Sequence, residues 1–139
     1  MIKSVKIALF LLLGIVLTSI SIAGGEETKI IFKASTNPGG IQKVDMVGGS
    51  YFFKPNYVIV KINVPVELAI KKEPGVVPHN IVMSSQEAGM SFKKDLTTDP
   101  KTIKFTPTKI GKYPFYCDKG IFFWNHREKG MEGVVEVTD

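Results

Sequence analysis

The chain has 139 residues, 44% hydrophobic and 22% charged, which fits one globular domain and excludes a disordered or collagen-like chain. Its formal net charge is +5, or +3 without Lys3 and Lys6 near the N-terminus, which is too small an excess to indicate nucleic-acid binding, and no basic helix with interleaved aromatic residues is present. The chain has a single cysteine, so it forms no internal disulfide. We therefore expect one small domain without a nucleic-acid partner.

The first 23 residues have the three parts of a secretory signal peptide. Lys3 and Lys6 give a positive start, residues 7–17 form an apolar run, and Ala23 ends a small-residue exit. The run is short for a membrane span, and no cysteine near the exit offers a lipid attachment site. We predict that residues 1–23 are a signal peptide and that the protein is exported to the periplasm or another extracytoplasmic compartment. We expect no stable membrane insertion after cleavage; an uncleaved N-terminal anchor is the alternative.

After the signal peptide, apolar residues recur with a period of two in short runs, which is typical of β-strands. Glycine and proline residues separate many of these runs. The runs cover residues 29–34, 58–64, 66–71, 79–82, 102–106, 113–117 and 133–137. Strands this short, with turns at frequent intervals, predict that residues 24–139 form one all-β sandwich or barrel.

Two segments depart from the alternating pattern. Pro114 lies inside a strand-like run, so we expect that segment to be at a sheet edge or irregular there. Between Ser84 and Pro100 the alternation is weak, and the residues from Ser84 to Glu87 favour the start of one short helix, although Gly89 disfavours it.

The only cysteine and both histidines fall near the ends of predicted strands. Cys117 ends one strand, and the spacing Cys-x8-His-x4-Met then brings His126 and Met131, directly before the last strand. His79 begins another strand. A thiolate favours Cu(I), imidazoles suit both oxidation states, and a weak thioether can complete such a site. We therefore predict one mononuclear copper ion bound by His79, Cys117, His126 and Met131.

Each of these residues also has an ordinary interpretation when it is taken alone. A lone cysteine is often buried and inert, a histidine is often a hydrogen-bonded structural residue, and a methionine often fills a core. Copper ligation explains them jointly, and it would occupy a thiol that otherwise oxidises in an exported protein. Zinc is the rival metal, but a thioether is rarely a zinc ligand. The carbonyl of Pro78 is the alternative to Met131 as the axial ligand.

Residues 50–139 resemble the cupredoxin family. The resemblance rests on Phe53-Lys54-Pro55-Asn56 before a valine-rich strand, on residues 105–113, and on Tyr116-Cys117. It implies a Greek-key β-sandwich, a type 1 copper site, and a role for Asn80 in tying the two ligand loops together. The loop from Cys117 to His126 is longer than that of plastocyanins and azurins, and its spacing is similar to that of the type 1 copper domain of copper nitrite reductases.

The histidine and cysteine counts exclude several enzyme classes. With both histidines assigned to one copper ion, none is left for a second, catalytic copper or for a Ser/His/Asp set, and a dinuclear copper centre would need a second cysteine. We therefore expect a one-electron carrier and not an enzyme, a monomer that docks transiently with redox partner proteins. A copper-binding or copper-delivery protein without electron transfer and a metal-free interaction module are the alternatives.

An aromatic segment, Ile121-Phe122-Phe123-Trp124, comes shortly before His126. It either packs inward and closes the end of the sandwich or surrounds the edge of His126 as a docking surface. In the second case the cations Lys119, Arg127 and Lys129, which flank it, would steer an acidic partner.

Overall fold

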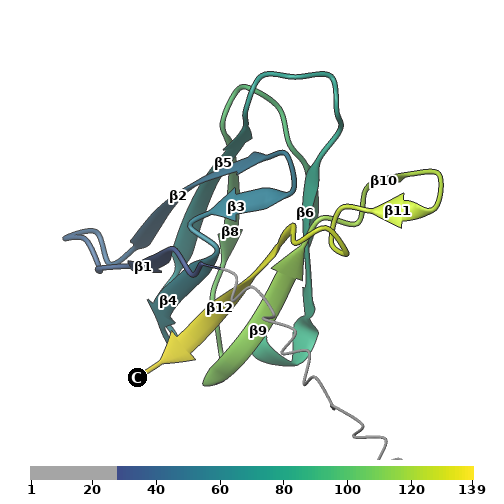
Figure 1. Ribbon diagram of the computed structural model, residues 1–139. Helices are drawn as coiled ribbons and strands as arrows, with labels where there is room; N and C mark the ends of the chain where they lie inside the picture. Colours follow the sequence, from purple (N-terminus) through teal and green to yellow (C-terminus); the bar gives the residue numbers. More distant parts are fainter. Residues whose placement is uncertain (1–27) are drawn as a thin grey trace, which may run out of the picture.

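The structure is a computed structural model that describes residues 28–139 (Figure 1). The predicted signal peptide, residues 1–23, lies outside the described residues. Within residues 28–139, no helix has the length and apolar character needed to cross a bilayer.

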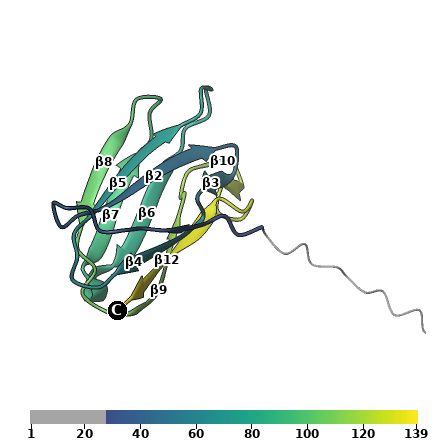
Figure 2. The same ribbon diagram turned by 90° about the vertical axis from the view of Figure 1, so that its left-hand side faces the viewer.

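Two β-sheets form two layers of a sandwich (Figures 1 and 2). The larger sheet has the strand order β1 (Ile31–Lys33), β4 (Tyr57–Lys61), β12 (Glu132–Thr138), β9 (Gly111–Tyr116), β6 (Asn80–Ser85) and β7 (Met90–Asp95). The smaller has the order β3 (Phe52–Lys54), β2 (Gln42–Gly49), β5 (Val66–Lys72) and β8 (Lys101–Phe105). A separate hairpin consists of β10 (Gly120–Ile121) and β11 (Trp124–Asn125). The all-β prediction is confirmed.

The alternation of the sequence explains why these strands pack as a sandwich. Along β5, Val66, Leu68 and Ile70 are buried while the residues between them are half-buried, because successive side chains of a strand point to opposite faces. Tyr113 and Phe115 of β9 are buried, as is Cys117 just beyond its end, so these three share the inner face as predicted. Within residues 28–139, the strands of both sheets surround one continuous core cluster.

The strand order matches the predicted Greek-key β-sandwich. Three strand pairs are parallel, β1 with β4, β4 with β12, and β2 with β5, and the remaining pairs are antiparallel. Parallel neighbours cannot be joined by a tight hairpin, so the chain crosses between the two layers to form them. These crossings bring the start of β6 and the end of β9 to the same end of the larger sheet.

The boundaries of two predicted strands were wrong. The run 58–64 ends as a strand at Lys61, because the chain turns at Asn63, which has a φ of 58°. In the run 29–34 only Ala34 is buried, and the short edge strand β1 is exposed along its length. In both cases the apolar pattern continues past the backbone that the sheet pairs.

The segment from Ser84 to Pro100 also differs from expectation. The predicted short helix is a single 3-10 turn, Gln86–Ala88, and Ser85, its N-cap residue, makes no side-chain capping hydrogen bond. The residues after it form β7, an edge strand. Most of its side chains are exposed, so its sequence shows little alternation of apolar and polar residues. Pro114 lies in an internal strand, yet the pairing of β9 with β6 reaches only Phe115 and Tyr116, so the expected irregularity is present.

Replacement of Phe53 by alanine should strongly destabilise the sandwich. Phe53 is wholly buried, and its ring meets the ring of Phe115 edge-to-face at 5.2 Å. We expect Phe53→Ala to lower the free energy of unfolding by about 3–5 kcal/mol, through lost burial and a residual cavity. Phe123→Ala, at a solvent-exposed position, is the matched control and should change it by less than about 0.5 kcal/mol. Equal midpoints in urea unfolding of the two variants would contradict this placement of the core.

Candidate metal centre

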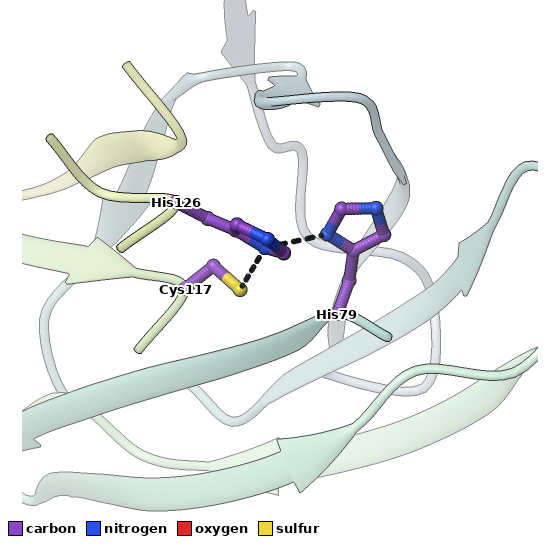
Figure 3. A group of neighbouring side chains, drawn as sticks. All are labelled: His79, Cys117 and His126. Carbon is purple, nitrogen blue, oxygen red and sulfur yellow. Dashed lines mark hydrogen bonds between the residues drawn. The ribbon is translucent and has the colours of Figure 1, made fainter. Parts of the chain in front are cut away.

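Three of the four predicted ligands come together at one end of the larger sheet (Figure 3). His79 directly precedes β6, Cys117 directly follows β9, and His126 directly follows β11. Because β6 and β9 are hydrogen-bonded neighbours, with Val82 opposite Tyr116, the sheet itself places His79 beside Cys117. The donor atoms of the three side chains all lie within 4.8 Å of one another, and all three side chains are buried.

Backbone hydrogen bonds close the loop that carries Cys117, His126 and Met131. The N–H of Cys117 donates to the carbonyl of Met131 at 3.0 Å, and the N–H of Met131 donates to the carbonyl of His126 at 3.0 Å. The N–H of His126 donates to the carbonyl of Lys119 at 2.8 Å. The main chain at positions 117, 126 and 131 is therefore held by hydrogen bonds within the loop.

The spacing of the donor atoms suits a metal ion. The Nδ1 atoms of His79 and His126 lie 3.1 Å apart, and the sulfur of Cys117 lies 3.5 Å from Nδ1 of His126. Bonds of about 2.0–2.1 Å to nitrogen and 2.3 Å to sulfur, at near-tetrahedral angles, would put neighbouring donors about 3.3–3.6 Å apart. The two nitrogens and the thiol face one another, so the donor set fits one ion between them.

The environment of the donors favours neutral imidazoles. Burial lowers the pKa of His79, and the neighbouring His126 and Lys72 lower it further. Burial also lowers the pKa of His126, with Lys129 acting in the same direction. Burial raises the pKa of the Cys117 thiol, against the lowering effect of the Asn80 and Lys119 backbone N–H groups. A neutral imidazole has a lone pair ready to bind a metal, while the thiol needs a cation beside it to ionise at neutral pH.

Asn80 links the two segments that carry the ligands. Its backbone N–H donates to the sulfur of Cys117 at 3.4 Å, and its side-chain amide donates to the Asp118 carboxylate at 2.6 Å. The backbone N–H of Asp118 returns a bond to the side-chain oxygen of Asn80 at 3.0 Å. The contact between the ligand segments that the resemblance implied for Asn80 is therefore present.

Lys93 on β7 extends this link and was not identified from the sequence. Its ammonium group donates to the Asp118 carboxylate at 2.6 Å, and this bond lowers the pKa of Asp118, with Asn80 adding to the effect. An exposed lysine on an edge strand carries no sequence signal of a partner 25 residues away.

Comparison with solved structures identifies the architecture. The metal-binding domain of the Cu(I)-exporting P-type ATPase CopA of Streptococcus pneumoniae, determined with Cu(I), superposes with a TM-score of 0.61 at 21% identity, over 81% of this chain and all of that one. Reduced auracyanin of Roseiflexus castenholzii gives 0.58 at 19% identity, over 76% and 99%. Auracyanin A of Chloroflexus aurantiacus, described as a "blue" copper protein, gives 0.55 at 16%, over 71% and 100%.

The chain has the cupredoxin fold. The sequence-based expectation is thereby confirmed at the level of the β-sandwich. No family profile matches the sequence, and no curated protein matches it.

Met131, the fourth predicted ligand of this cupredoxin-fold chain, is fully buried at the end of the ligand loop. Its methyl group would lie 3.3 Å from a Cβ built on Gly48 of β2, so its side chain reaches the inner surface of the smaller sheet. Its position is consistent with its predicted role as an axial ligand, which stays a prediction.

The aromatic segment does not pack inward. Phe122 and Phe123 are 98% and 96% exposed, and Trp124 and Ile121 are 67% and 49% exposed. Of the two alternatives for this segment, inward packing that closes the end of the sandwich is therefore wrong. Tyr51, which the sequence did not single out, covers His126 instead, with the two rings edge-to-face at 5.2 Å. Tyr51 follows Gly49 and Ser50 in a turn, where no pattern distinguishes it.

Removal of the Asn80 side chain should loosen the site more than removal of its neighbouring ion pair. In Asn80→Ala the N–H of Asp118 loses its acceptor, so we expect about 1–3 kcal/mol less free energy of unfolding and about 10–100-fold weaker metal binding. Lys93→Met, which removes only an exposed ion pair, should leave the free energy of unfolding close to that of the parent protein. Chemical unfolding and competition against a chelator measure both quantities, and similar losses in the two variants would be inconsistent with this role of Asn80.

Proposed function

We propose that this protein is an exported type 1 copper protein that carries single electrons and catalyses no reaction of its own. His79 and His126 supply two imidazoles, Cys117 the thiolate, and Met131 a weak axial thioether. A bound copper ion would supply reversible one-electron chemistry between Cu(I) and Cu(II). The observation that carries the proposal is the buried His–Cys–His donor set at 3.1 and 3.5 Å in a cupredoxin fold.

The chemistry of the donors favours copper over zinc. Structural zinc sites are built from four cysteine and histidine ligands, whereas one cysteine, two histidines and a nearby methionine are the soft and borderline donors of electron-transfer copper. In residues 28–139, the only cluster of three histidine, cysteine or carboxylate side chains is this one. No acidic side chain joins it, so the hard oxygen ligands that suit magnesium or calcium are missing from the cluster.

The protein holds its donors rigidly, which suits electron transfer. The Cys117–Met131 and Met131–His126 backbone bonds fix one loop, and the Asn80–Asp118 pair fixes it against the segment of His79. Burial of the three donor side chains keeps bulk water away from them. A site that cannot rearrange holds nearly the same geometry in both oxidation states, so little has to move when an electron enters or leaves.

The partners of this carrier would dock transiently at the end of the sandwich where His126 lies. Lys3 and Lys6 leave with the signal peptide, so 18 − 2 = 16 basic residues remain against 13 acidic ones, a net charge of +3. Lys119, Arg127 and Lys129 lie on the ligand loop. Lys119 and Arg127 are in ion pairs with Asp95 and Glu132, so Lys129 would supply the positive charge close to His126. Long-range attraction of this kind accelerates encounters without demanding a large interface.

Copper binding without electron transfer is the second candidate. It is favoured by the similarity to the metal-binding domain of a Cu(I)-exporting ATPase. The same three ligands would then hold copper for exchange with another protein. The two functions differ in whether bound copper cycles between oxidation states or leaves when a competing ligand is offered.

A visible absorption spectrum tests the proposed function directly. Residues 24–139 with one equivalent of Cu(II) should show an intense thiolate-to-copper band that bleaches reversibly with ascorbate. Cys117→Ser should abolish the band completely, because the serine hydroxyl is a hard, weak donor. A colourless complex that gives up its copper to a mild chelator would support delivery over electron transfer, and no copper binding at all would refute both.

Replacement of Met131 tests the axial ligand. Met131→Leu keeps a side chain of similar volume, so the sandwich should stay folded and the thiolate band should persist. Loss of the thioether destabilises Cu(II) more than Cu(I), so we expect the reduction potential to rise. A tenfold change in the ratio of the Cu(II) and Cu(I) affinities corresponds to about 60 mV. Protein-film voltammetry gives the value, and an unchanged potential would leave the Pro78 carbonyl as the axial donor.

A further inference from the structure

The hairpin between Cys117 and His126 carries the largest exposed aromatic group of the described chain at its tip. Strands β10 and β11 pair Ile121 with Trp124, and Phe122 and Phe123 form the turn between them. Both phenylalanines are almost completely exposed, and the hairpin projects from the sandwich (Figure 1). Apolar surface this prominent on a small domain marks an interaction site.

The backbone conformation of the hairpin keeps these side chains exposed to solvent. A Cβ on Gly120 would lie 2.5 Å from the carbonyl oxygen of Trp124, so only glycine allows the two strands to approach this closely. At its base, His126 bonds back to Lys119, and the N–H of Glu128 is capped by the side chain of Asn125 at 2.8 Å. The exposure of the tip therefore follows from the backbone conformation. Covering the tip with an apolar environment would lower the free energy of the system.

Basic side chains surround the base of the hairpin. Lys129 places its ammonium group 4.8 Å from the ring centres of both Trp124 and Tyr51. Lys119 pairs with Asp95 and Arg127 pairs with Glu132, whereas Lys129 takes part in no ion pair within residues 28–139. Aromatic residues at the end of a projection, with cations one step behind them, are the arrangement found at membrane–water interfaces.

The dimensions of the hairpin favour a bilayer over a flat protein surface. The turn lies about three residues beyond the Lys119–His126 bond, which at about 3.3 Å per residue is about 10 Å. Interfacial segments bury their apolar side chains about 5–10 Å deep. With the base of the hairpin level with the lipid headgroups, its tip would reach this depth. A protein partner would instead need a groove of that depth, because a flat surface would touch only the tip.

We propose that the β10–β11 hairpin is a peripheral membrane anchor that inserts Phe122, Phe123 and Trp124 reversibly into the headgroup–acyl boundary of a bilayer. Lys129 meets anionic headgroups at the level of the hairpin base. The contact is shallow and reversible, which agrees with the expectation of no stable insertion after signal cleavage. It would hold His126 at the membrane surface, and the electron-transfer partners reached from there would be membrane-bound. The proposal does not depend on whether copper is bound.

The single tryptophan of the chain lies in the hairpin, so its fluorescence reports on the tip directly. The test uses residues 24–139, which contain all the strands described here and lack the apolar run 7–17 that would itself bind lipid. Vesicles of phosphatidylcholine, alone or with phosphatidylglycerol, are added to this protein. We expect a blue shift of the Trp124 emission and co-sedimentation with the vesicles, about fivefold stronger with the anionic lipid, and we expect Lys129→Gln to lose this enhancement.

Two variants distinguish binding through the hairpin from non-specific adsorption of exposed apolar residues. Full burial of one phenylalanine is worth about tenfold to a hundredfold in an equilibrium constant, so Phe122→Ser with Phe123→Ser should weaken vesicle binding by at least about a hundredfold. Ile110→Ser changes an exposed apolar residue at the opposite end of β9 and should leave binding unchanged. Circular dichroism confirms that both variants are folded.

Two results would overturn the proposal. If the Trp124 emission and the sedimentation of the protein are unchanged with both kinds of vesicle, the hairpin does not bind lipid. A groove in a protein partner would then be the site that receives it. If the double serine variant binds vesicles as well as the parent does, another surface is responsible. Neither result affects the visible absorption band, so failure of this anchor and failure of the copper proposal are distinguishable.

Discussion

The burial of two imidazoles and a thiol at one end of a β-sandwich is the constraint on which the rest of this structure depends. Buried polar groups without partners are costly, and here the three groups face mainly one another. Without a cation, the Nδ1–H of one imidazole donates a hydrogen bond to Nδ1 of the other, and the raised pKa of Cys117 keeps its sulfur a thiol. A metal ion would accept all three lone pairs at once, so the same burial that costs stability in the metal-free chain creates affinity for the metal.

The fold places these groups with ordinary sheet geometry. Two neighbouring strands, β6 and β9, deliver His79 and Cys117, and three main-chain hydrogen bonds deliver His126 and Met131 on the loop that follows. Asn80 then joins the two segments through its backbone and its side chain together. Because few of these contacts depend on long flexible side chains, the site inherits the rigidity of the sheet.

The clustering of His79, Cys117 and His126 could be predicted from the sequence because these residue types are rare in this chain and lie at the ends of predicted strands. A chain with one cysteine and two histidines leaves few combinations, and the period-two pattern of residues 113–117 put Cys117 on the inner face. The contacts of Tyr51 and Lys93 could not be predicted in this way. They depend on turn conformation and on strand register between β6 and β7, and neither leaves a mark in the local pattern of hydrophobic residues. The wrong boundary at Lys61 has a related cause, since apolar residues continue past the point where the sheet stops pairing.

The exposed aromatic tip shows the opposite limitation. From sequence alone, four consecutive apolar residues beside a ligand favour inward packing as much as exposure, because hydrophobicity does not tell which side of a hairpin meets the core. The short pairing of β10 with β11 settles this by holding Phe122 and Phe123 in a turn beyond the last backbone bond. The hairpin ends at the Lys119–His126 hydrogen bond, so a hydrogen-bonded segment separates its tip from the candidate ligand residues. A contact at the tip would therefore change the donor geometry little, and the same loop could bind a membrane while its ends hold the ligand residues in place.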